Sequence, residues 1–278
     1  MIKIKQYCRN HRLVVSSGIM FLLVLLPVFW VHPTNAQSED LKTAKEAVQQ
    51  SYDKLVEVQG EQTLTKEEQA KQELEALIAA LKEVVQFTIT ETESLIQHLS
   101  AIKGLSVETA KLQLDYLKEL DEFLIYQQEF LIKITPQEEV GALTLVEIKQ
   151  LALDFKNWRE TVYDPEIKKI VSFIMVFKGS ELLSIATSRF NKIALDLRLF
   201  QNSKLIKVDL LMPVLQQAGD YLKEASKLNQ VAIKSLLATS TDPVDTNKLV
   251  ERVVGLIKSS YGKFLEMSSL VKKMLNIQ

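Results

Sequence analysis

Apolar residues recur every three or four positions over long stretches of this chain, and short polar segments separate the stretches. Such spacing places apolar side chains on one side of an α-helix. The most apolar stretch after the N-terminal region is Asp164–Phe200, in which seven of the eight residues of Ile170–Phe177 are apolar. A bilayer span needs about 20 apolar residues, and Lys178 and Glu181 interrupt this run. We therefore expect a helix that other helices surround.

Beyond Phe177 the apolar residues fall on one side of the same predicted helix. We expect the following side chains to face the protein interior: Leu182, Ile185, Ala186, Ile193, Leu197 and Phe200.

Capping residues predict where the other helices begin. Thr65 with Glu68 three residues later is typical of a capping box. Thr135-Pro136 with Glu138, and Asp164-Pro165, predict two further starts, because proline fits the first turn of a helix. The expected helices cover residues 37–59, 65–104, 106–135, 136–163, 164–200, 209–238 and 246–276.

Two stretches depart from the regular apolar spacing. Phe87–Thr92 alternates β-branched and polar residues, so it is either a hinge or part of a long helix that tolerates threonines. Gly255, Ser259 and Gly262 fall on one side of the last predicted helix, where we expect another helix to approach closely.

Composition supports an all-α fold, because six prolines and eight glycines are few for 278 residues. We predict an elongated bundle of about seven long helices. The heptad-like spacing of the first two also admits a coiled-coil hairpin, residues 37–104, that projects from a bundle body, residues 105–278.

The first 36 residues have the pattern of a signal peptide. Leu13–Val31 is apolar, Thr34-Asn35-Ala36 ends in a small residue, and four basic residues precede both: Lys3, Lys5, Arg9 and Arg12. We expect cleavage after Ala36; the alternative is an uncleaved membrane anchor. In both cases the remaining chain is extracytoplasmic, in the periplasm, in the envelope or secreted.

Cleavage would remove four basic residues and change the formal net charge from −1 to −5. Such a surface predicts that nucleic acid is not a partner. It would also remove Cys8, the single cysteine, so that no disulfide or thiol nucleophile remains.

The sequence also lacks the usual signatures of catalysis. No GxSxG, HExxH, glycine-rich phosphate loop or EF-hand pattern occurs, and His98 is the only histidine after residue 36. No carboxylate or histidine lies three or four residues from His98, as a helical metal site would require. We therefore predict no enzyme activity, no cofactor and no metal.

Four residues are candidates for an interaction site. Trp158, Tyr163 and Tyr126 belong to a concentration of aromatic residues that is either core or a binding surface. Arg189 interrupts the apolar side of the 164–200 helix, where an ion pair with a nearby carboxylate is the simpler expectation and ligand recognition the alternative.

The segment WRETVYDPEIKKIVSFIMVFKGSELLSIATSRFNKIALDLRLF resembles a central segment of predicted secreted helical proteins from uncultivated bacteria, over about a sixth of the chain. The resemblance implies an extracytoplasmic helical protein and no particular activity. Two functions fit: a non-enzymatic bundle that contacts a protein partner or another copy of itself, or a membrane-active, lipid-binding bundle that exposes residues 170–177.

Overall fold

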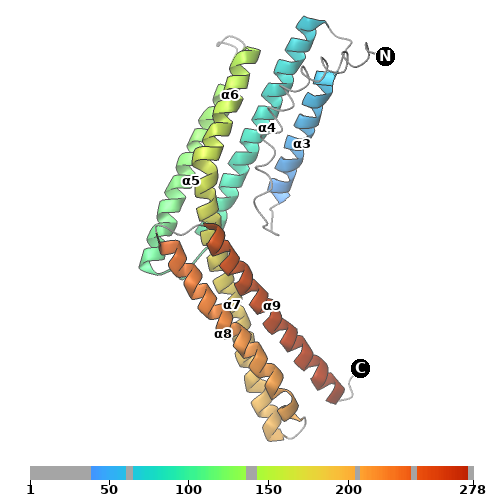
Figure 1. The fold of residues 1–278 in the computed structure, drawn as a ribbon, viewed down its shortest axis with the longest axis vertical. Coiled ribbons are helices and arrows are strands. Elements are labelled where there is room, and N and C mark those ends of the chain that lie inside the picture. The colour runs from blue at the N-terminus through green and yellow to red at the C-terminus, as the bar shows by residue number, and fades with distance from the viewer. Residues whose placement is uncertain (1–38, 61–64, 136–142, 204–206, 239–242, 275–278) are drawn as a thin grey trace, which may run out of the picture. The chain divides into compact units, whose positions relative to one another are not determined.

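A computed structural model describes residues 39–60, 65–135, 143–203, 207–238 and 243–274. Within these ranges every regular element is helical and none is a strand, which confirms the all-α prediction (Figure 1). The elements are α3 (Glu39–Gly60), α4 (Lys66–Ser100), α5 (Val107–Lys133), α6 (Leu145–Trp158), the π-helical turn η2 (Arg159–Tyr163), α7 (Asp164–Ser203), the 3-10 turn η3 (Val208–Leu210), α8 (Met212–Leu237) and α9 (Pro243–Met274).

The described ranges contain six separate helices, and the predicted number of seven is wrong because α6, η2 and α7 form one continuous helix. Asp164 has helical dihedral angles and donates its N–H to the carbonyl of Arg159, five residues earlier. Pro165 has no N–H to donate, and its ring would crowd the preceding turn. The wider π-helical turn accommodates the proline inside the helix, so Asp164-Pro165 does not begin a new one.

Capping residues confirm one predicted helix start and reveal another. At the start of α4, Thr65 donates its N–H to Glu68 Oε2 (3.1 Å), and Glu68 donates its N–H to Thr65 Oγ1 (3.3 Å). Helix α6 begins with a second capping box, formed by Thr144 and Glu147. Most of the box predicted after Thr135 lies outside the described residues.

The chain divides into two compact units. Among the described residues, unit 1 comprises those of 39–97 and 115–165, and unit 2 comprises those of 98–114 and 166–274. The boundary predicted after residue 104 falls inside the 98–114 segment of unit 2. The elongated bundle and the projecting coiled-coil hairpin remain predictions.

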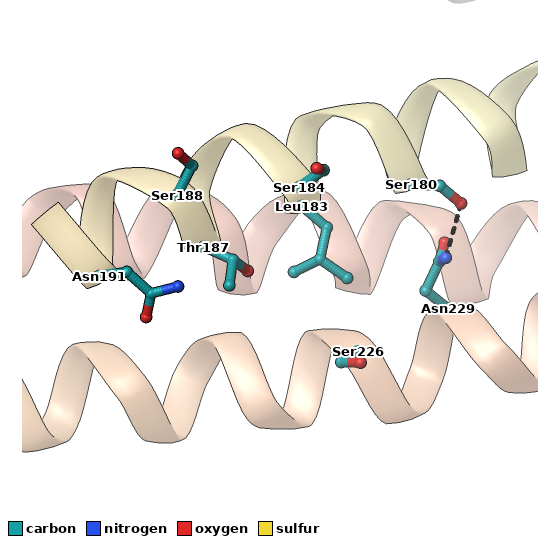
Figure 2. A pocket seen from close by; sticks show the side chains of 8 residues that line it. All are labelled: Ser180, Leu183, Ser184, Thr187, Ser188, Asn191, Ser226 and Asn229. Carbon is teal, nitrogen blue, oxygen red and sulfur yellow. Dashed lines mark hydrogen bonds between the residues drawn. The ribbon is translucent and has the colours of Figure 1, made fainter. Parts of the chain in front are cut away.

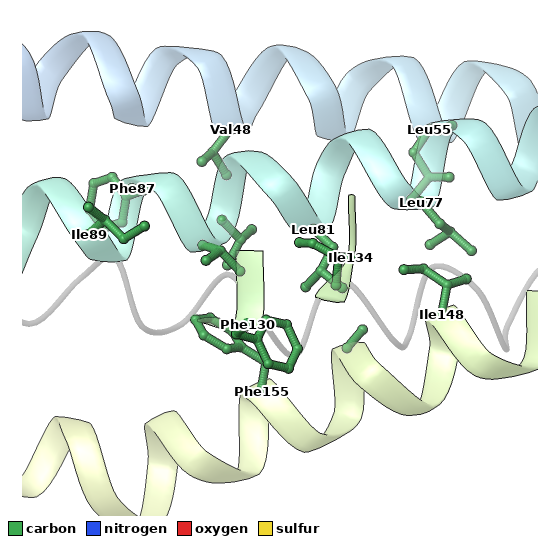
Figure 3. Close-up of a cluster of buried hydrophobic side chains, with 14 residues drawn as sticks. Val48, Leu55, Leu77, Leu81, Phe87, Ile89, Phe130, Ile134, Ile148 and Phe155 are labelled. Atoms are coloured by element: carbon green, nitrogen blue, oxygen red, sulfur yellow. The ribbon is translucent and has the colours of Figure 1, made fainter. Parts of the chain in front are cut away.

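Unit 1 has one large apolar core, to which α3, α4, α5 and α6 all contribute (Figure 3). The inner side of α3 follows its heptad-like apolar spacing: Val48 and Leu55 are buried in this core, and Leu41, Ala44 and Val58 pack against it. From α5 and α6, Phe130 and Phe155 enter the same core.

Unit 2 has three smaller cores, each of which joins α7, α8 and α9 or their ends. They centre on Val176, Ala232 and Val250; on Ala186, Leu222, Ala225, Val253 and Ile257; and on Leu197, Leu211, Val214, Leu215 and Met267. Residue numbers rise along α7 and α9 and fall along α8 from the first core to the third, so α8 runs opposite to the other two helices.

The apolar run of α7 lies in the interior, as predicted: Ile170, Phe173 and Val176 are fully buried. By length and composition alone, the continuous helix 145–201 is apolar enough to cross a membrane, and less than half of its most apolar window is buried.

The predicted inner side of α7 after residue 177 is only partly right. Ala186 and Leu197 are buried and Ile193 is partly buried, whereas Leu182, Ile185 and Phe200 are exposed. The observed inner side is rotated by about one residue and includes Leu183 and Phe190. Both stripes have helical spacing, so periodicity alone did not select between them.

The close approach predicted at the small residues of α9 is wrong. Gly255 and Gly262 have no neighbouring atom within 4 Å of the position where a Cβ would lie, and Ser259 is exposed. The close approach in unit 2 is at Gly219 of α8, where a Cβ would lie 3.0 Å from the ring of Phe190.

Candidate functional site

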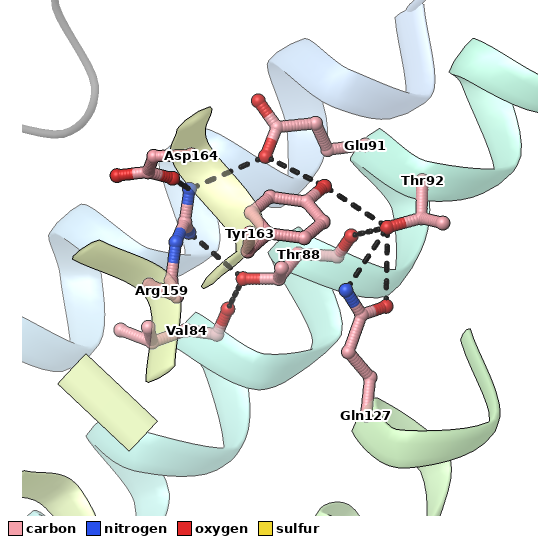
Figure 4. Close-up of polar contacts among 8 residues, drawn as sticks. All are labelled: Val84, Thr88, Glu91, Thr92, Gln127, Arg159, Tyr163 and Asp164. Atoms are coloured by element: carbon pink, nitrogen blue, oxygen red, sulfur yellow. Dashed lines mark hydrogen bonds and ion pairs between the residues drawn. The ribbon is translucent and has the colours of Figure 1, made fainter. Parts of the chain in front are cut away.

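A cluster of buried polar side chains lies inside unit 1 (Figure 4). Three elements bring it together: α4, α5, and the continuous segment formed by η2 and the first residue of α7. Its members are Thr88, Glu91 and Thr92 from α4, Gln127 from α5, Arg159 and Tyr163 from η2, and Asp164.

Arg159 is the only buried cation of this cluster, with an exposed fraction of 4%. Its Nη1 donates to Thr88 Oγ1 (2.8 Å), and its Nη2 lies 3.3 Å from Glu91 Oε2 and 3.4 Å from Asp164 Oδ1. The guanidinium also lies over the ring of Tyr163, 5.2 Å from its centre. A buried charge is tolerated only when it is paired and hydrogen-bonded, so Arg159 depends on Thr88 and Glu91 of α4 and on Asp164.

Tyr163 is completely buried and connects the ion pair to the neutral part of the cluster. Its hydroxyl donates to Glu91 Oε2 (3.2 Å) and lies 2.9 Å from Thr92 Oγ1. Gln127 Nε2 in turn donates to Thr92 Oγ1 (3.0 Å). The chain of hydrogen bonds therefore runs from Arg159 to α5 without passing through exposed groups.

The threonines of α4 fit this helix because their hydroxyls also bond its backbone. Thr88 Oγ1 donates to the carbonyl of Val84 (2.9 Å), and Thr92 Oγ1 lies 2.8 Å from the carbonyl of Thr88. Side-chain hydrogen bonds of this kind compete with regular helix geometry and lower helix propensity. The segment Phe87–Thr92 is fully helical, so the long-helix interpretation is confirmed. Three residues of its strand-like pattern, Thr88, Glu91 and Thr92, belong to the polar cluster.

Burial raises the pKa of Tyr163 well above its usual value of 10, and the negative charge of Glu91 adds to this effect. The positive charge of Arg159 opposes the rise. Tyr163 is therefore a neutral hydrogen-bond donor at every physiological pH.

The geometry indicates that this cluster holds helices together. Its central groups are nearly inaccessible, with exposed fractions of 0% for Tyr163, 4% for Arg159 and 8% for Glu91. Their polar atoms already bond one another, apart from Arg159 Nε, which has no hydrogen-bond partner among the described residues. A reaction would first require the ion pair to open.

Three of the four predicted interaction residues lie together. Trp158 stacks on Tyr126 (ring centres 4.3 Å apart) and lies 5.3 Å from Tyr163, and Phe123, Phe130 and Phe155 complete the aromatic cluster. Tyr163 is buried, while Trp158 and Tyr126 are partly exposed. Tyr163 is therefore a core residue, and of these three residues only Trp158 and Tyr126 are accessible to a partner.

Arg189, the fourth predicted residue, lies in unit 2 and is exposed. Its guanidinium lies over the ring of Tyr261 in α9, 5.2 Å from the ring centre, a cation–π arrangement. The expected ion pair is not present among the described residues, where no carboxylate lies within 4 Å of Arg189. Among the described residues, the buried arginine with carboxylate partners is Arg159.

A groove of about 480 Å³ lies between α7 and α8 in unit 2 (Figure 2). One apolar and seven uncharged polar residues line it: Ser180, Leu183, Ser184, Thr187, Ser188, Asn191, Ser226 and Asn229. Asn229 Nδ2 donates to Ser180 Oγ (2.7 Å), which joins the two helices by one hydrogen bond. The unpartnered Oδ1 lies toward Gly179, in contact range of a Cβ placed there. With no ionisable lining residue, the groove lacks an acid or base.

The described ranges contain no group of three or more histidine, cysteine, aspartate or glutamate side chains that could hold a metal ion. His98 is exposed near the end of α4.

Sequence reasoning missed Thr88, Glu91, Thr92 and Gln127 as a cluster. The available signal was the pair of threonines four residues apart, with a glutamate next to Thr92. Four-residue spacing places Thr88 and Thr92 on one side of α4. The partner residues are 35 to 72 positions away in the chain, so only the fold identifies them.

Comparisons with protein-family models, with characterised proteins and with solved structures found no match. The resemblance to secreted helical proteins therefore remains a prediction.

Proposed function

We propose that this chain is a non-enzymatic helical-bundle protein of the cell envelope that acts through protein–protein contact, and that unit 2 provides the contact surface. The observation behind this proposal is the distribution of exposed large apolar side chains. In unit 1 they are Val56, Ile125, Ile132, Val146 and Val162; in unit 2 they are Val107, Leu114, Leu182, Ile185, Leu195, Leu199, Phe200, Leu210, Met212, Val231, Leu237, Val254 and Leu265.

Exposed apolar area in one part of a molecule favours an interaction site there, because burying it against a partner is favourable. Leu265 has an exposed fraction of 72% and Leu199 one of 60%. The proposal of a non-enzymatic protein is supported by the burial of Arg159, Glu91 and Tyr163, which points to a structural role for these ionisable residues. The location in the envelope rests on the signal-peptide pattern of residues 1–36.

Site-specific photocrosslinking tests this function. A photoreactive residue at Leu199 or Leu265 of the full chain should give protein adducts in the envelope of the source cells. The matched control is Val146 of unit 1, which is equally accessible at 76% exposed. Equal adduct yields from Val146 and from the two unit 2 positions would contradict the assignment of the contact surface to unit 2.

A lipid-binding bundle that opens to expose Ile170–Phe177 is the second candidate function. The hydropathy of helix 145–201 favours it. It predicts that the protein floats with lipid vesicles and that residue 173 becomes reactive to a membrane-soluble probe. Without flotation, this second function is excluded.

A further inference from the structure

The two units carry opposite net charges. The described residues of unit 1 include 21 acidic and 11 basic side chains, and those of unit 2 include 10 acidic and 18 basic side chains. The near-neutral charge of the whole chain therefore describes neither unit. Opposite charges of this size attract over about a Debye length and favour contact between a unit 1 and a unit 2 surface.

On unit 1, the outer side of α5 combines acidic and apolar residues; we call it the α5 face. Ile125 and Ile132 are seven residues apart and have exposed fractions of 57% and 59%. Seven residues are close to two helical turns, so both side chains lie on one side of the helix. Three exposed carboxylates surround them: Asp121, Glu122 and Glu129. Lys118, seven residues before Ile125, lies on the same side and pairs with Glu122 (3.6 Å), so Asp121 and Glu129 are the carboxylates left for a partner.

On unit 2, one exposed row of α7 combines basic and apolar residues. We call it the α7 row, and it consists of Leu182, Ile185, Arg189, Lys192, Asp196 and Leu199. The spacing alternates between three and four residues, which is the heptad spacing of a helix that packs against another helix. The three apolar members are 44% to 60% exposed.

We propose that the α7 row of one copy binds the α5 face of a second copy, so that the chain associates head to tail. This inference rests on the proposed function and names the partner as the protein itself. Each surface supplies apolar side chains at heptad spacing, and the carboxylates of one surface meet the cations of the other. Asp196 is the one carboxylate of the α7 row, and Arg189 and Lys192 outnumber it.

Because the two surfaces differ, the contact is heterologous and each copy keeps one free surface of each kind. Such contacts close into rings or extend into chains. The contact area of two helix rows is small, so we expect association that is weak, concentration-dependent and sensitive to salt.

Sedimentation velocity of the full chain, purified from cells that process it naturally, tests this proposal. The sedimentation coefficient should rise with protein concentration at low salt and fall when salt is added. Glu129→Lys and Lys192→Glu should each weaken self-association by roughly tenfold. The matched controls are Glu75→Lys of α4 and Lys234→Glu of α8, which reverse exposed charges outside the two surfaces.

A mixing experiment tests head-to-tail geometry directly. Neither variant associates well alone. A mixture contains one unaltered pair, the α5 face of Lys192→Glu with the α7 row of Glu129→Lys, and one pair in which both charges are reversed and remain opposite. The mixture should therefore recover the concentration-dependent association that each variant loses alone. Ile125→Ser with Ile132→Ser should abolish association, while Val146→Ser should not.

Three results would overturn the proposal: sedimentation that does not depend on concentration, a mixture of the two charge variants that stays monomeric, or a salt-dependent contraction of a monomer, which would indicate contact within one chain. A monomer that still crosslinks to another envelope protein through Leu199 would refute self-association and leave the proposed function standing.

Discussion

The two units bury polar side chains in different ways. In unit 1, Arg159, Glu91 and Tyr163 belong to one network that joins α4, α5 and η2. In unit 2, Asn229, Asn247 and Ser260 are separate, and each has a buried atom without a hydrogen-bond partner among the described residues. Arg159 Nε of unit 1 also has no partner among the described residues, but the other groups of its network bond one another. A connected polar network fixes one arrangement of helices, whereas an isolated, half-satisfied group costs free energy without doing so. Replacing a buried polar residue by an apolar one should therefore lower the free energy of unfolding strongly in unit 1 and only slightly in unit 2.

Arg159→Met should give the largest effect. It leaves the buried carboxylate of Glu91 without its cation, and breaking a buried pair costs about 3–5 kcal/mol. Urea unfolding followed by Trp158 emission measures this, since Trp158 lies in unit 1. The control is Arg252→Met in unit 2, whose pair with Glu224 spans 3.8 Å and is exposed. Its cost, read from hydrogen exchange of α9 peptides because Trp158 reports unit 1, should be less than about 1 kcal/mol. A similar cost for both variants would remove the distinction between the units.

Two amide-to-leucine substitutions compare the units more directly. Gln127→Leu removes a donor to Thr92 and should destabilise unit 1 by about 1–3 kcal/mol. Asn229→Leu removes an amide whose Oδ1 is already unpartnered, so it should change the stability of unit 2 by less than about 1 kcal/mol.

Hydrogen exchange, read separately for peptides of α5 and α8, reports the two stabilities within one sample. The quantity compared is the increase in exchange rate relative to wild type. A larger increase in α8 of Asn229→Leu than in α5 of Gln127→Leu would mean that Asn229 stabilises the helix contact more strongly than its unpartnered atom suggests.

Tyr163→Phe should make the stability of unit 1 less sensitive to alkaline pH. The folded protein holds the Tyr163 proton to a pKa well above 10, while the unfolded chain releases it near pH 10. The contribution of this tyrosine is therefore fully present below pH 10 and is lost as pH rises above it, at up to about 1.4 kcal/mol per pH unit.

At neutral pH the same substitution should cost about 1–2 kcal/mol, because Glu91 loses a donor. The measurement is the difference in unfolding free energy between wild type and Tyr163→Phe, taken at pH 7 and at several values above 10. A difference that stays constant across this range would show that Tyr163 ionises equally easily in both states.

Local signals in the sequence predicted much of the fold. The capping box of Thr65 and Glu68 involves residues three apart, so it could be recognised directly, and the inner side of α3 follows from its spacing. Asp164-Pro165 was wrongly predicted to begin a new helix, because a π-helical turn accommodates the proline within a continuous helix. That turn contains Arg159 and Tyr163, which bond residues of α4 far away in the sequence. Local patterns therefore predicted the helices and not their continuity.

The candidate site was less accessible to sequence reasoning. Trp158, Tyr126 and Tyr163 were singled out as an aromatic group and do pack together. Arg189 was chosen over Arg159 because it interrupts an apolar stripe, yet that stripe is rotated from the true inner side of α7. An arginine's burial depends on which helices surround it, and this information lies in long-range contacts.

Glycine-to-alanine substitutions should give the smallest effects and test the misjudged close approach in unit 2. Gly255 has open space around its Cβ position, so Gly255→Ala should stabilise α9 by about 0.5–1 kcal/mol through helix propensity alone. At Gly219 a Cβ would lie 3.0 Å from Phe190 Cζ, so the ring must move and Gly219→Ala should lose that gain or become destabilising. Hydrogen exchange of α8 and α9 peptides measures both. If Gly219→Ala stabilises as much as Gly255→Ala, Phe190 moves freely and the contact does not limit how closely α7 and α8 pack.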